Sequence, residues 1–70
     1  VTIFPNPTSE KFEIKTTEKI QSIKVFNTFG SVVLKSSVNL ISVDQLPTGF
    51  YFVNIQTEKS NITRKIIVQH

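Results

Sequence analysis

Apolar and polar residues alternate along most of this 70-residue chain, and short runs rich in Asn, Asp, Gly and Pro interrupt the alternation. A period of two places successive side chains on opposite faces of a β-strand, so each alternating segment has one apolar face. No segment has the 3.6-residue period of an amphipathic helix. Ala and Met are absent, whereas Val, Ile, Thr and Phe, which favour strands, are frequent. The pattern predicts an all-β fold of antiparallel strands.

The turn residues divide the chain into seven predicted strands. They cover residues 2–4, 11–16, 22–27, 31–36, 39–43, 50–57 and 62–69. Strands of about five or six residues joined by short loops fit this length. We predict a small immunoglobulin-like antiparallel β-sandwich of about seven strands, in which two sheets bury their apolar faces against each other. A small barrel and a single meander are the alternatives.

Only an apolar core is available to stabilise so short a chain. There is no Cys to form disulfides, and a single His cannot supply a structural zinc site. A core of this size gives a free energy of unfolding of only about 3 to 5 kcal/mol. The alternation assigns Phe12, Ile14, Ile23 and Val25 to this core. We expect no stable membrane insertion, because the longest apolar runs fall far short of the roughly 20 residues that span a bilayer.

Residues suited to catalysis are too few for an active site. The chain has one Asp, Asp44 in a turn, and one His, His70 at the last position, so no nucleophile and base can be combined. The four Glu lie beside lysines or in turns, which is typical of a solvated face. The two glycines form no phosphate-binding loop. We therefore predict no enzymatic activity, no cofactor and no metal.

The basic residues do not indicate a nucleic-acid partner. The net charge is +3, but the seven Lys and the single Arg are spread over the whole length. Lysines on exposed strand faces also keep small sheets from pairing edge to edge. We expect no nucleic acid to bind.

An apolar stripe is predicted on the outside of the sandwich. If Tyr51 faces the core, then Phe50 and Phe52 face outward, and the same alternation sends Phe26 and Ile67 outward on their strands. In an immunoglobulin-like order these three strands are neighbours in one sheet. Such a stripe suggests a docking surface, although cross-strand aromatic pairs also stabilise ordinary sheets.

Four motifs along the chain resemble those of one family. Residues 3–8 join an apolar residue and an aromatic one to Pro-Asn-Pro, and residues 23–30 form a strand that ends in Asn, two further residues and Gly. Residues 46–53 contain Leu-x-x-Gly-x-Tyr, and residues 65–68 a closing basic and apolar strand. In this order and spacing the motifs resemble type A C-terminal sorting domains of the type IX secretion system of Bacteroidota. The motif residues are Pro5, Asn6, Pro7, Asn27, Gly30, Leu46, Gly49 and Tyr51.

The resemblance implies an export address. Residues 1–70 would be a single C-terminal sorting domain at the end of a larger secreted protein, with the cargo on its N-terminal side. The cargo would cross the inner membrane by a separate N-terminal signal, and the domain would then be recognised in the periplasm by the outer-membrane translocon. A sortase-like protease would then remove the domain as the cargo is attached to surface lipopolysaccharide or released. The final location would be the medium or the cell surface.

Two other classes stay open at this stage. One is an immunoglobulin-like adhesive or structural module of a surface protein. The other is an accessory carbohydrate-binding module, which needs an exposed aromatic platform, and this chain has no Trp and a single Tyr.

The motif residues have expected roles in folding. Leu46 caps the core, Gly49 allows a tight backbone turn into the next strand, and the Tyr51 hydroxyl reaches a nearby backbone group, as in a tyrosine corner. Pro5 and Pro7 end the first strand and orient whatever precedes the domain.

A recognition surface for the translocon is our further hypothesis. We place it on the last predicted strand and on the outward aromatic residues, because basic and apolar residues coincide there. The expected recognition residues are Arg64, Lys65, Ile67, Phe26, Phe50 and Phe52.

Overall fold

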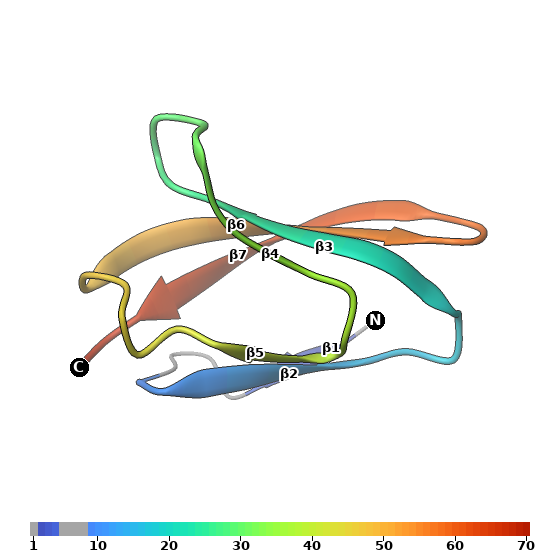
Figure 1. The fold of residues 1–70 in the computed structure, drawn as a ribbon, viewed down its shortest axis with the longest axis horizontal. Coiled ribbons are helices and arrows are strands. Elements are labelled where there is room, and N and C mark those ends of the chain that lie inside the picture. Colours follow the sequence, from blue (N-terminus) through green and yellow to red (C-terminus); the bar gives the residue numbers. More distant parts are fainter. Residues whose placement is uncertain (1, 5–8) are drawn as a thin grey trace.

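The structure, a computed structural model, describes residues 2–4 and 9–70, which form seven strands and no helix. The strands are β1 (Thr2–Phe4), β2 (Lys11–Lys15), β3 (Ile20–Phe26), β4 (Val32–Ser36), β5 (Leu40–Ser42), β6 (Gly49–Thr57) and β7 (Asn61–Val68). One sheet has the order β1-β2-β5 and the other the order β4-β3-β6-β7, and all neighbouring strands are antiparallel. The two sheets lie over each other as two layers (Figure 1). Among the described residues, no helix is long and apolar enough to cross a membrane.

This arrangement confirms the predicted all-β sandwich and not the barrel or the single meander. The described strands form two separate sheets, whereas a barrel or a meander would join them into one sheet. The fourth strand pairs with the third and gives the larger sheet four strands. In constant-type immunoglobulin domains the fourth strand belongs to the other sheet, so this chain has a different version of the same architecture.

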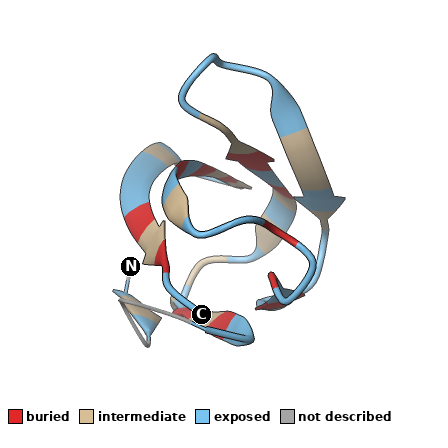
Figure 2. Cartoon of the chain, turned by 90° about the vertical axis from the view of Figure 1, so that its left-hand side faces the viewer, coloured by how far each residue is buried: buried red, intermediate tan, exposed pale blue. Residues whose placement is uncertain are grey.

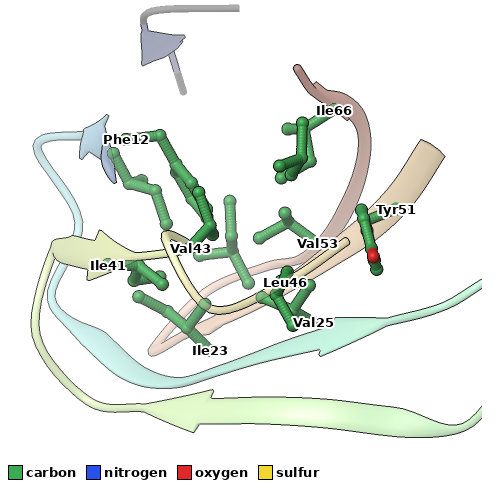
Figure 3. Close-up of a cluster of buried hydrophobic side chains, with 12 residues drawn as sticks. Phe12, Ile23, Val25, Ile41, Val43, Leu46, Tyr51, Val53 and Ile66 are labelled. Carbon is green, nitrogen blue, oxygen red and sulfur yellow. The ribbon is translucent and has the colours of Figure 1, made fainter. Parts of the chain in front are cut away.

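The core between the sheets is formed by twelve buried apolar side chains. They are Phe12, Ile14, Ile23, Val25, Ile41, Val43, Leu46, Tyr51, Val53, Ile55, Ile66 and Val68. The side chains labelled in Figure 3 converge from both sheets and from the β5–β6 loop. Buried positions form separate bands along the strands, with exposed positions between them (Figure 2). The alternation therefore predicted the core correctly.

The start of β3 differs from the prediction. This strand begins at Ile20, two residues before the predicted start at 22. The register with β6 shifts between Ile20 and Ser22, so that Gln21 has no directly opposite partner and Ile20 pairs with Thr57. A bulge of this kind interrupts the alternation of apolar and polar residues. The sequence pattern therefore did not reveal the first two residues of the strand.

The β3–β4 turn depends on a residue in the left-handed region and on one asparagine side chain. Gly30 has φ of 86°, in the left-handed region that favours glycine. Asn27 Oδ1 accepts hydrogen bonds from the N–H groups of Phe29 at 2.9 Å and Ser31 at 3.0 Å. The Gly30 N–H donates to the Asn27 carbonyl at 3.0 Å. These bonds fix the turn and explain why Asn and Gly stand at these two positions.

The predicted tyrosine corner is present at the end of the β5–β6 loop. The ring of Tyr51 is buried, and its hydroxyl donates a 2.7 Å hydrogen bond to the Pro47 carbonyl. Leu46 is buried in the core beneath the same loop. The last residue also contacts this loop, because His70 Nε2 lies 2.7 Å from the Leu46 carbonyl oxygen and the His70 N–H donates to Thr48 Oγ1 at 3.3 Å. The corner thus ties the loop to β6 and to the end of the chain.

Gly49 lies where the backbone favours glycine, in line with its expected role. Its φ of 158° is a positive value that L side chains rarely adopt, and a Cβ added there would meet no atom within 4 Å. A side chain at this position would therefore be strained by the backbone conformation and not by neighbouring atoms.

A buried hydroxyl organises the opposite end of the sandwich. Thr57 is buried, and its Oγ1 accepts hydrogen bonds from the N–H of Ser60 at 2.9 Å and of Lys59 at 3.3 Å. The same hydroxyl donates to the carboxylate of Glu18. The sequence assigned Glu18 to a solvated face, and this contact gives it a structural role in joining the β2–β3 and β6–β7 turns.

Replacing Gly30 by Ala should destabilise the domain by about 1 to 2 kcal/mol, because an Ala side chain is strained at this φ. Gly30→Asn should retain most of the stability, because Asn tolerates the left-handed region better. Urea unfolding followed by circular dichroism measures both variants. Equal stability of Gly30→Ala and the unchanged domain would contradict the turn described above.

Tyr51→Phe should cost about 1 kcal/mol, because it removes the bond to Pro47 and keeps the buried ring. Ser42→Ala is the matched control, since its hydroxyl bond to Asp44 is exposed and should change stability by less than about 0.5 kcal/mol. The urea midpoints of the two variants test this. If Tyr51→Phe shifts no more than Ser42→Ala, the corner bond does not stabilise the fold.

Candidate recognition face

The outward side of the β4-β3-β6-β7 sheet, which we call the outer face, carries the apolar stripe predicted from the sequence. Phe50 and Phe52 are 50% and 38% exposed, although they flank the buried Tyr51. Phe52 lies directly opposite Phe26 on β3, and Phe50 lies opposite Ile67 on β7. The predicted neighbourhood of these three strands is confirmed.

The stripe extends across the whole width of the sheet. Phe26 also pairs with Val32 on β4, which is 42% exposed, and Phe52 pairs with Lys65 on β7. Directly opposite residues in antiparallel strands project from the same face. A single row therefore runs from Val32 through two aromatic rings to a cation, with Phe50 and Ile67 beside it.

Lys65 is part of the aromatic cluster. Its Nζ lies 4.3 Å from the centroid of the Phe50 ring, within the range of a cation–π interaction. This contact is diagonal, since Lys65 pairs directly with Phe52. The basic and apolar character of the outer face thus coincide at one place.

Arg64 does not lie on the outer face. It pairs with Val53, which is fully buried, so the side chain of Arg64 projects from the inner side of β7, where it is exposed at the edge of the sheet. The sequence hypothesis included both Arg64 and Lys65 because basic and apolar residues coincide on the last strand. Adjacent strand residues point to opposite faces, and five of the six expected recognition residues share the outer face without Arg64.

The other half of the outer face is polar and internally hydrogen-bonded. Asn54 Nδ2 donates to Asn61 Oδ1 and to Thr63 Oγ1, the latter at 3.2 Å. Asn61 Nδ2 donates to Gln56 Oε1 at 2.7 Å. These side chains satisfy one another and leave the aromatic half as the part of the face with unused apolar surface.

The fold concentrates positive charge that the sequence spreads out. The four strands of the larger sheet contain Lys24, Lys35, Arg64 and Lys65, and none of the five acidic residues of the chain belongs to them. Lys24 lies directly opposite Lys35, and both are exposed. Reading the basic residues in chain order missed this cluster, because only strand pairing brings them together.

The described motif residues lie at the same end of the sandwich as the aromatic half of the outer face. Asn27 and Gly30 form the β3–β4 turn, and Leu46, Gly49 and Tyr51 form the corner that leads into β6. The other motif residues, Pro5, Asn6 and Pro7, lie outside the described residues. Within the described part of the chain, no three His, Cys, Asp or Glu residues are grouped so as to hold a metal ion.

These features define a small immunoglobulin-like β-sandwich whose distinctive surface is a basic and aromatic sheet face. The family model of the secretion system C-terminal sorting domain matches residues 2–69, and the chain belongs to this family. It is a C-terminal sorting signal of type IX secretion, as the sequence motifs implied. No curated protein matches the chain.

Lys65→Glu should destabilise the domain by about 1 kcal/mol or less, because Lys65 is exposed and its contact with Phe50 is a surface cation–π pair. Ile66→Glu, at the next position, should abolish cooperative unfolding, because it buries a carboxylate in the core. Thermal unfolding by circular dichroism distinguishes them. A Lys65→Glu variant that is unfolded would assign Lys65 to the scaffold instead of the surface.

Proposed function

We propose that residues 1–70 form a single sorting domain at the end of a larger secreted protein, and that the type IX outer-membrane translocon reads it as a folded surface. The family requires contact with the secretion machinery and a cargo in the same chain. Recognition of a folded surface suits this chain, because its buried apolar side chains form a core and aromatic residues such as Phe50 and Phe52 are exposed.

The outer face is our choice for the recognition surface, through Phe26, Phe50, Phe52, Lys65 and Ile67. The observation that carries this choice is the row of half-buried and exposed aromatic side chains that ends in Lys65. Aromatic residues are enriched in protein interfaces, and a charged residue beside them favours a partner of opposite charge.

Arg64 stays in the hypothesis as a contact on the other side of β7. A partner that binds at the edge of the sheet can contact both sides of the edge strand β7. Separate substitution of Arg64 and Lys65 tells which side matters.

The domain itself performs no chemistry in this proposal. The inventory supports this, because the chain has one His, one Asp and no Cys. A sortase-like protease acts on the domain, which reaches the periplasm with its cargo before export. Export then places the cargo on the cell surface or in the medium, as the family implies.

A secretion assay tests the proposal. A reporter with an inner-membrane signal is fused upstream of Val1 and expressed in Bacteroidota strains with and without a working type IX translocon. We expect the reporter outside the cell only when the translocon works. Lys65→Glu should reduce export by about tenfold or more, since it reverses a charge and would place like charges together in the interface.

Lys15→Glu is the matched control, because it makes the same change of charge at an exposed position of the smaller sheet. It should export like the unchanged domain. A folded domain that leaves the reporter in the periplasm of the working strain would refute the export function. Equal loss with Lys15→Glu and Lys65→Glu would refute the outer face as the recognition surface.

A further inference from the structure

The tip of the β3–β4 turn presents an aromatic residue that neither the fold nor the proposed recognition face uses. Phe29 is 92% exposed, the highest value of any large apolar side chain among the described residues. The turn stands away from both sheets (Figure 1). A phenylalanine in this position contributes no core packing.

The backbone beneath Phe29 is held in one conformation. Its own N–H donates to Asn27 Oδ1 at 2.9 Å, and the same oxygen accepts the N–H of Ser31 at 3.0 Å. The Asn27 N–H in turn donates to the Ser31 carbonyl at 3.0 Å. Because the turn is already ordered, a partner that binds Phe29 does not have to fix a flexible loop.

Two lysines on the same hairpin are placed at a cost to stability. Lys24 and Lys35 are directly opposite each other across β3 and β4, and like charges in this position repel. No acidic residue occurs between positions 20 and 36. Carboxylates brought by a partner would relieve this repulsion, so the charge of the hairpin favours an acidic surface.

We propose that the β3–β4 hairpin docks onto an acidic protein surface with an apolar pocket, in which Phe29 fills the pocket and Lys24 and Lys35 pair with carboxylates. The inference rests on the proposed function, because the surface belongs to a component of the secretion machinery. An anionic membrane fits less well. A single aromatic side chain gives weak attachment to lipid, and the two lysines lie on the sheet and not around the tip.

The first test removes the aromatic ring. Phe29→Ser is compared with Val38→Ser, which changes another large apolar side chain, 59% exposed, in the β4–β5 connection. Both variants should unfold at the temperature of the unchanged domain, since neither side chain is in the core. In the reporter assay Phe29→Ser should lower export by about tenfold and Val38→Ser should not lower it. Equal export by the two variants would overturn the proposal.

The second test separates docking from folding. The double variant Lys24→Gln with Lys35→Gln should be as stable as the unchanged domain or more stable, because it removes a repulsion, and it should still export less. Lys19→Gln with Lys59→Gln removes the same charge at exposed positions outside the larger sheet and should export normally. Undiminished export by the first double variant would contradict the carboxylate pairing.

Export by the unchanged domain distinguishes two outcomes: failure of the hairpin proposal and failure of the proposed export function. If it exports the reporter and the hairpin variants do so equally well, only the inference fails. If it exports nothing, the proposed function fails, and the inference fails with it. Binding of the purified domain to phosphatidylglycerol vesicles, lost in Phe29→Ser, would overturn the protein partner in favour of a lipid surface.

Discussion

The burial of two small apolar sheet faces against each other is the constraint on which the rest of this structure depends. With no disulfide available and twelve buried apolar side chains to hold it, the chain has little stability to lose. Nearly every buried position of the described residues is therefore apolar, and the polar exception among them, Thr57, is satisfied by several hydrogen bonds. Variation is left to the outward positions, where the family signal can be carried without weakening the core.

Local chemistry made most of the fold predictable from the sequence. A period of two marks a strand and its buried side, which identified residues such as Phe12 and Ile14, and Asn27 with Gly30 marked a turn. The bulge near Gln21 was not visible, because it depends on how β6 pairs with β3. The positive φ of Gly49 agrees with a need for glycine, but the open space around it could not be predicted, because the atoms that lie near a backbone position depend on the tertiary structure.

The recognition face was predictable only in part for the same reason. Alternation placed Phe50 and Phe52 outside, but it could not give the register that sets Lys24 opposite Lys35. The hypothesis placed Arg64 and Lys65 on one surface, whereas the pleat of β7 directs them to opposite faces. A strand can be predicted from its own residues, whereas the composition of a surface depends on how strands pair. The sequence alone therefore predicts strands better than it predicts surfaces.

The charged residues are distributed unevenly over the sandwich, and this affects how the domain approaches a charged partner. Four basic residues and no acidic one belong to the larger sheet, while the five acidic residues lie in the smaller sheet and the connecting segments. The positive charge is therefore concentrated on the larger sheet, since in the smaller sheet Lys11 and Lys15 are partly offset by Glu13. In the field of a negatively charged partner the domain would rotate to present the larger sheet before any contact forms, and such steering raises association rates at low ionic strength. Orientation would then be a property of the domain alone, independent of the cargo attached to it.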